Sequence, residues 1–414
     1  MEYKERTFDK DDILKRYPIV EEINEYISIL EKSNFDSSIS IALNAKWGSG
    51  KTFFVSMWRN YLENNNIRTV YYNAWENDDS DSAILPLLYR IISLIKDVEN
   101  ENFIDYAKKF LKTLTVETTK FGLKNLLGIN SEIEKIIEKG LDDLSSTELS
   151  NIFKEYDQYY GDRKALEENL REMVPEDGKL WIFIDDLDRC KPEFSIATLE
   201  CIKHFFNIRD IIYIFSIDIE QLGVVVSKVY GKEIESNSYL KRFFDIIYQI
   251  PDADYIIYIK NKIENMNITA EIKALIQCQT LAKLFRHFHC SLRDINLSLT
   301  HLEIFMIRNK ENILQQKISY EALKIYYYFI VIKDKYNINY LDIIHGNYTL
   351  EENENSYRLP ISKFYIYNEQ IRKLLGQISD GRAMLYTKDI IKQFGLFEDD
   401  NIDTFKQHME TYLS

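Results

Sequence analysis

Residues 38–52 read SISIALNAKWGSGKT and decide the fold expected for this chain. The apolar stretch 38–45 is a strand candidate, and it runs directly into a loop that contains Gly48 and Gly50. Residues 52–63, which follow the loop, have helical periodicity. A strand, a glycine loop and a helix in this order form an arrangement in which backbone N–H groups enclose a phosphate. The stretch therefore predicts a phosphate-binding α/β domain.

The loop at residues 45–52 has the spacing G-x-x-x-x-G-K-[ST], except that Ala45 stands where the first glycine is expected. Lys51 is predicted to reach the β- and γ-phosphates of a nucleotide, and the Thr52 hydroxyl is predicted to bind magnesium. A surface turn that matches by chance is the alternative, but it does not account for the strand before the loop and the helix after it. The residues predicted to bind the nucleotide are Trp47, Gly48, Ser49, Gly50, Lys51, Thr52 and Phe53.

A second motif, LWIFIDDLDR at residues 180–189, places acidic side chains at the end of a buried strand. Asp185, at the strand tip, is the predicted magnesium-site carboxylate, and Asp186 is predicted to orient and deprotonate the attacking water. A solvated acidic turn after a core strand is the alternative, and the glycine loop argues against it. No N-K-x-D guanine motif is present. The two motifs together predict an ATPase that uses ATP and Mg²⁺.

Four further apolar runs, at residues 67–75, 180–185, 211–217 and 244–250, predict a sheet of five strands with the first one. Helical segments separate the strands, which indicates an α/β fold with a parallel sheet and helices on both sides. The expected domains are a P-loop core (1–98 and 173–252), a helical insertion (99–172), a helical lid (253–318) and a mostly helical C-terminal module (319–414).

Composition restricts the classes of partner and compartment. The net charge of −14 argues against a general duplex-DNA coat, although it leaves a local basic patch for nucleic acid open. The four cysteines have no metal-ligand spacing, which favours a reducing, cytoplasmic setting. The start of the chain lacks the apolar core of a signal peptide, and no apolar run approaches the roughly 18 residues that span a bilayer. We expect a soluble protein without membrane insertion.

Beyond the two motifs, the chain resembles the KAP family of P-loop NTPases over about residues 10–305. The resemblance implies an additional-strand (ASCE) ATPase core, similar to AAA+ and STAND proteins, with strand order 5-1-4-3-2. The stretches that carry it are Trp47 within WGSGKT, Asn73-Ala74-Trp75, the motif DDLDRC from Asp185 to Cys190, Ile217-Asp218 followed by Glu220-Gln221-Leu222, Tyr239-Leu240-Lys241, and Ser291-Leu292-Arg293-Asp294.

The resemblance also implies roles for polar residues outside the two motifs. Asp218 or Ser216, at the tip of the fourth strand, would sense the γ-phosphate. Arg242, before the fifth strand, would be an arginine finger that acts on a neighbouring subunit, unless it only caps the preceding helix. Arg293 would contact the nucleotide from the lid, unless it pairs with Asp294.

Three other features have structural interpretations. We expect Asp188 and Arg189 to form a local salt bridge, and we expect Trp75 to be a packing residue rather than one that stacks on a base. Many relatives carry transmembrane helices in the insertion, but residues 132–139 (EIEKIIEK) are charged and amphipathic, which favours a soluble branch of the family.

These observations favour an ATP-driven switch or motor, in which ATP binding closes the lid and hydrolysis resets it. The insertion and the C-terminal module would pass the change to a protein effector or to another copy of the chain. Because bacterial KAP proteins are often tied to exclusion of phage or plasmids, the resemblance implies a role in defence. A nucleotide-gated assembly scaffold with little turnover is the alternative, and a small-molecule kinase is less favoured because no acceptor site is evident.

Overall fold

The computed structural model describes residues 6–33, 37–80 and 178–315, with single residues or short pieces within 83–91, 164–174, 323–335 and 350–357. The described residues divide into two compact units. The first consists of those within Met1–Lys46 and Lys51–Pro251, and the second of those within Trp47–Gly50 and Asp252–Ser414. Most of the predicted insertion, including its amphipathic segment at 132–139, lies outside the described residues.

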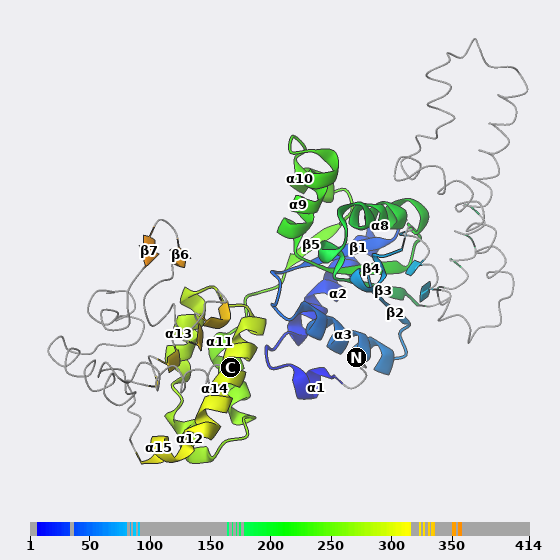
Figure 1. Ribbon diagram of the computed structural model, residues 1–414. Coiled ribbons are helices and arrows are strands. Elements are labelled where there is room, and N and C mark those ends of the chain that lie inside the picture. Colours follow the sequence, from blue (N-terminus) through cyan, green and yellow to red (C-terminus); the bar gives the residue numbers. More distant parts are fainter. Residues whose placement is uncertain are drawn as a thin grey trace, which may run out of the picture. The chain divides into compact units, whose positions relative to one another are not determined.

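The first unit is built on a parallel sheet of five strands in the order β2-β3-β4-β1-β5 (Figure 1). The α/β class and the predicted strand order are confirmed. Every residue of β3 and β4 is buried, as expected for central strands that are covered on both faces. The strands are β1 (Ile39–Asn44), β2 (Thr69–Asn73), β3 (Leu180–Asp185), β4 (Ile211–Ile217) and β5 (Ile246–Gln249).

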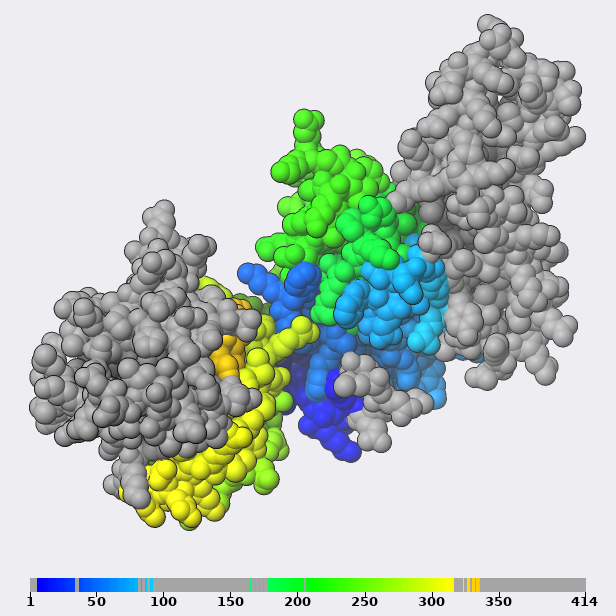
Figure 2. Space-filling model, viewed as in Figure 1, coloured from blue at the N-terminus to red at the C-terminus, as the bar shows by residue number. Residues whose placement is uncertain are grey.

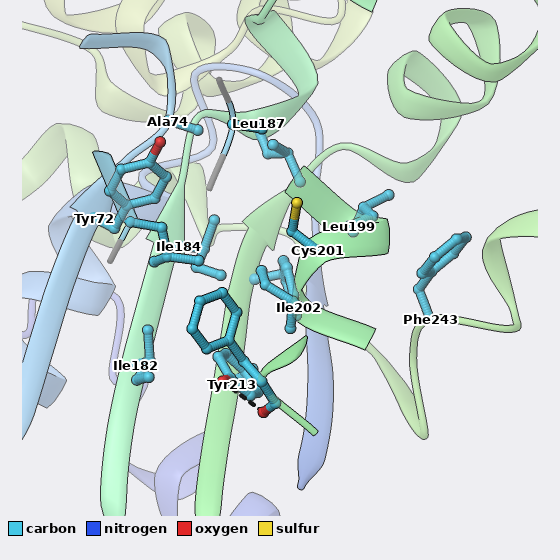
Figure 3. Packing of buried hydrophobic residues seen from close by; sticks show 14 of the residues in the cluster. Tyr72, Ala74, Ile182, Ile184, Leu187, Leu199, Cys201, Ile202, Tyr213 and Phe243 are labelled. Atoms are coloured by element: carbon cyan, nitrogen blue, oxygen red, sulfur yellow. Dashed lines mark hydrogen bonds between the residues drawn. The ribbon is translucent and has the colours of Figure 1, made fainter. Parts of the chain in front are cut away.

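One face of the sheet packs against α2 (Tyr17–Lys32) and α3 (Lys51–Asn64), and the other against α8 (Pro192–Phe205) and α9 (Ile219–Tyr230). Figure 3 shows the core between the sheet and helices α8 and α9, in which Ile182, Ile184 and Tyr213 of the sheet lie beside Leu199 and Ile202 of α8. β1 lies between the later strands β4 and β5, and β2 lies next to β3. Residues before 80 and after 180 are therefore neighbours on the surface of this unit (Figure 2). The remaining short elements of the unit are α1 (Phe8–Asp11), η1 (Trp75–Asn77), η3 (Leu187–Arg189) and α10 (Ser236–Leu240).

Trp58 of α3 lies at the centre of the core between the sheet and helices α2 and α3. Its side chain is fully buried, and its ring centroid lies 5.6 Å from those of Trp181 and Phe183. We expect Trp58→Ala to lower the free energy of unfolding by about 3–5 kcal/mol, measured by urea denaturation, because it removes these contacts and leaves a cavity. Trp58→Phe is the control and should cost less, since the indole N–H that it removes has no hydrogen-bond partner within the described ranges. Equal losses in the two variants would contradict this packing account.

The second strand is shorter than residues 67–75. Its end is fixed by Asn73, whose side-chain oxygen accepts hydrogen bonds from the backbone N–H groups of Trp75 (3.0 Å) and Glu76 (3.3 Å). Such an Asx turn ends the extended conformation, and η1 follows. Trp75 is consequently 54% exposed, so its prediction as a packing residue was wrong.

The second unit is helical between residues 255 and 314. Its longest helix, α14, begins with a capping box in which Ser291 and Asp294 bond reciprocally to each other's backbone N–H groups. In the predicted C-terminal module, the polar stretch around residues 349–356 forms a short antiparallel pair, β6 (Leu350–Glu352) and β7 (Asn355–Tyr357). The helices are α11 (Tyr255–Glu264), α12 (Ala270–Leu275), α13 (Cys278–His287), α14 (Leu292–Arg308) and α15 (Lys310–Leu314).

Candidate nucleotide site

The glycine loop leaves the carboxyl end of β1 and leads into α3. Gly48 and Gly50 have φ values of 74° and 85°, in the region that side chains with a Cβ atom rarely adopt. A Cβ atom on Gly48 would also lie 2.6 Å from the Ser291 hydroxyl oxygen, within the second unit. Ala45 is not among the described residues with positive φ, and its side chain is buried in the core. Alanine therefore fits the first position of the motif without backbone strain.

Lys51, the first residue of α3, is directed at its own loop. Its ammonium group donates to the backbone carbonyl oxygens of Ala45 and of Lys46, the latter at 3.3 Å. Burial lowers the pKa of Lys51, while the nearby carboxylates, Asp188 foremost, oppose that shift. Thr52 follows as the second, half-buried residue of the helix. A buried ammonium group that donates to neutral carbonyls is well placed to exchange them for phosphate oxygens.

Asp185 lies at the tip of β3 and is completely buried. One carboxylate oxygen, Oδ2, accepts a hydrogen bond from the Tyr71 hydroxyl at 3.1 Å, and the other accepts one from the backbone N–H of Asp186 at 3.0 Å. In the sheet register Asp185 pairs with Asn73 on one side and Ser216 on the other. The predicted magnesium-site carboxylate therefore stands among polar residues at the carboxyl edge of the sheet.

Asp186 has a left-handed backbone conformation, with φ 57° and ψ 24°. Aspartate and asparagine adopt this conformation more readily than other residues with a side chain. Burial, followed by repulsion from Asp185, raises the pKa of Asp186 to about 6, although the Arg189 guanidinium at 3.1 Å opposes the rise. A carboxylate with a pKa close to neutrality has the basicity that proton abstraction from water requires.

The predicted salt bridge between Asp188 and Arg189 was wrong in its partner, because Arg189 pairs with Asp186. Asp188 instead accepts a hydrogen bond from the backbone N–H of Asp218 at 2.8 Å. This bond joins η3 to the end of β4. Among the carboxylates, Asp188 also has the largest effect on the pKa of Lys51. Asp188 therefore contributes to the electrostatics of the site, which the sequence pattern did not indicate.

The two candidates for a phosphate sensor differ in what they already bind. The Asp218 carboxylate caps α9 by accepting from the backbone N–H groups of Glu220 (3.2 Å) and Gln221 (3.4 Å). Ser216 is buried beside Asp185, and its hydroxyl has no hydrogen-bond partner among the described residues. A buried hydroxyl without a partner costs free energy that a ligand oxygen would recover, which favours Ser216 over Asp218 as the sensor.

The remaining predicted residues of the first unit lie outside this polar cluster. Arg242 is exposed after α10, with its guanidinium 5.9 Å from the ring centroid of Tyr239. An exposed cation is compatible with an arginine finger, which remains a prediction. The guanidinium of Arg6 lies 4.3 Å from the ring centroid of Phe53, so one face of this ring is already covered.

In the second unit, Arg293 is exposed in the first turn of α14. The alternative pairing of Arg293 with Asp294 is not observed, because Asp294 accepts a hydrogen bond from Lys335 at 2.9 Å. Burial alone would raise the pKa of Asp294, but the hydrogen bonds from Lys335 and Ser291 lower it. Trp47 is 43% exposed, and it lies in the loop with Ser49.

The chemistry of the donor set suits magnesium. The predicted ligands, the Thr52 hydroxyl and the Asp185 carboxylate, have hard oxygen atoms, and Mg²⁺ is commonly held by one or two such groups together with water and substrate phosphates. Among the residues that the structure describes there is no cluster of three or more His, Cys, Asp or Glu side chains for a metal ion. The oxygen atoms of Thr52 and Asp185 are of the kind that fits an ion bound together with a nucleotide.

A five-stranded parallel sheet, a glycine loop that leads into a helix, and a buried strand that ends in a carboxylate define a P-loop NTPase, a class that binds and hydrolyses nucleoside triphosphates. The KAP family P-loop domain matches residues 20–326, and the chain belongs to this family. No similar protein was found among those with curated functions. Within the described ranges, no helix has both the length and the apolar character needed to cross a membrane.

Proposed function

We propose that this protein is a magnesium-dependent ATPase whose nucleotide state controls a protein effector or its own assembly. The observation that carries the proposal is the carboxylate pair at the tip of β3, in which Asp185 is fixed by two hydrogen bonds and Asp186 has a pKa of about 6. The absence of an N-K-x-D motif favours ATP over GTP. Family membership supports a role in defence against phage or mobile elements, because bacterial KAP proteins are often tied to their exclusion.

Binding begins with the loop. Lys51 leaves the carbonyl oxygens of Ala45 and Lys46 and donates to the β- and γ-phosphates, where charge-assisted bonds compensate the burial of its ammonium group. The N–H groups around Gly48 and Gly50 hold the phosphate chain. The Thr52 hydroxyl and the Asp185 carboxylate would hold magnesium, which would neutralise phosphate charge when it is bound with the nucleotide.

Hydrolysis then depends on Asp186. Its carboxylate orients the attacking water and accepts a proton from it, while Arg189 keeps the carboxylate in place. The Ser216 hydroxyl donates to the γ-phosphate and loses this bond when the phosphate departs, which reports the nucleotide state to β4 and α9. Arg242 of a neighbouring subunit stabilises the charge that develops on the transferred phosphoryl group.

A nucleotide-gated scaffold that scarcely turns ATP over is the alternative function. Asp186 argues against it, because an acidic residue beside the magnesium-site carboxylate is what an active hydrolase requires. The two functions differ in what hydrolysis does to assembly.

We expect Asp186→Asn to accumulate an ATP-bound assembled state, since the variant binds ATP but cannot hydrolyse it to return to the unassembled state. The measurement is the molar mass of the wild type and the variant by light scattering with ATP and Mg²⁺. Lys51→Met, which cannot hold the phosphates, is the control and should stay in the nucleotide-free state. Identical assembly of the wild type and Asp186→Asn under turnover conditions would contradict the switch and favour the scaffold.

A further inference from the structure

Tyr71 contacts the magnesium-site carboxylate although no sequence motif includes it. Its hydroxyl donates to Oδ2 of Asp185 at 3.1 Å. In the β2–β3 register Tyr71 pairs with Phe183 and Asn73 pairs with Asp185. Alternate residues of a strand point to the same face, so Tyr71 and Asp185 are diagonal neighbours on adjacent strands, within reach of a long side chain.

The ring of Tyr71 is itself held by the P-loop helix. The guanidinium of Arg59 lies 4.9 Å from the ring centroid, and Arg59 pairs with Glu63 at 3.1 Å. Glu63 also accepts a hydrogen bond from the Thr69 hydroxyl, which ties α3 to the start of β2. Helix α3 begins with Lys51 and Thr52. A continuous set of contacts therefore runs from the helix that carries the magnesium-binding threonine to the opposing carboxylate.

We propose that Tyr71 is a positioning residue that fixes the Asp185 carboxylate for Mg²⁺; this inference rests on the proposed ATPase function. The ion requires near-octahedral geometry, so it discriminates against a carboxylate that rotates. The two hydrogen bonds to Asp185, from Tyr71 and from the Asp186 backbone, hold one oxygen each and together define the plane of the carboxylate. Groups that orient metal ligands in this way typically contribute about 10- to 100-fold to metal affinity.

The test is Tyr71→Phe, which keeps the ring and its contact with Arg59 but removes the hydroxyl. The readout is the Mg²⁺ concentration for half-maximal binding of a non-hydrolysable ATP analogue, measured by calorimetry and compared with the Mg²⁺ dependence of phosphate release. We expect this concentration to rise about 10- to 100-fold. Binding of the analogue in EDTA should stay unchanged, because Tyr71 acts only through Asp185; this binding also shows that the loop is folded.

Tyr72→Phe is the matched control, since it removes a hydroxyl from the next residue of the same strand. The Tyr72 hydroxyl is buried and has no hydrogen-bond partner in the part of the chain that the structure describes, and its side chain belongs to the core on the other face of the sheet. The Tyr72→Phe variant should bind Mg²⁺ and the ATP analogue as the wild type does. A Tyr71→Phe protein whose Mg²⁺ requirement stays within about twofold of the wild type, against the 10-fold minimum expected, would overturn the inference and leave the ATPase intact. A wild type without Mg²⁺-dependent binding would overturn both.

Discussion

Asp186→Asn is expected to reduce the turnover of ATP by at least about 100-fold and to leave binding of ATP and Mg²⁺ close to that of the wild type, because general bases contribute about 10²- to 10⁴-fold. The amide of asparagine cannot accept a proton from water at neutral pH. Asparagine tolerates the left-handed backbone of this position, so the turn into η3 should be retained. Single-turnover phosphate release, with the affinity measured separately, separates the chemical step from binding.

Thermal unfolding of the nucleotide-free protein is the control for this variant. The folded state raises the pKa of Asp186 to about 6, so stability from this group is present below its unfolded pKa and is lost as the pH rises through about 6. At pH 8 the ionised carboxylate opposes folding by up to about 3 kcal/mol. Asparagine removes that charge, although it also gives up the ion pair with Arg189.

Asp186→Asn should therefore unfold at the same or a higher temperature than the wild type at about pH 8. The difference in unfolding temperature should shrink toward about pH 4, where the Asp186 carboxyl of the folded wild type is protonated and neutral like the asparagine amide. A variant that loses turnover and is also much less stable at pH 8 would show that misfolding, and not the missing base, accounts for the loss.

Lys51→Met is expected to weaken ATP binding by about 10- to 150-fold for each charge-assisted hydrogen bond lost, since such bonds contribute about 1.5–3 kcal/mol. Methionine has a similar length, so the side chain can still fill its buried position. Equilibrium dialysis with labelled ATP measures the effect. Lys46→Met removes the same charge from the same loop, but Lys46 is exposed and only its backbone carbonyl contacts Lys51. Similar losses in both variants would indicate a general charge effect and contradict the assigned contact.

The sheet and the glycine loop could be predicted because their signals are local. Continuous apolar runs identified β3 and β4 to the residue, since strands covered on both faces contain few polar side chains. The strand order could not be obtained in this way; it came from the family resemblance. The P-loop likewise depends on φ values at Gly48 and Gly50 that the spacing of the motif already implies.

The contacts that complete the site were not predictable from local patterns. Tyr71 and Asp185 are 114 residues apart in sequence, and the bond from Asp218 to Asp188 spans 30 residues. Each depends on strand register, which apolar periodicity does not specify. The end of β2 was missed for another reason: the Asx turn of Asn73 outweighs the aromatic and β-branched character of its neighbours, and it leaves Trp75 exposed.

Phosphate release from ATP by the wild-type protein, measured with Mg²⁺ and with EDTA, tests whether the chain is a magnesium-dependent ATPase. We expect steady turnover that requires Mg²⁺, because we propose that the fixed Asp185 carboxylate holds the ion and that Asp186 acts as the base. Stable binding of ATP and Mg²⁺ without release of phosphate would contradict the ATPase and leave the nucleotide-gated scaffold.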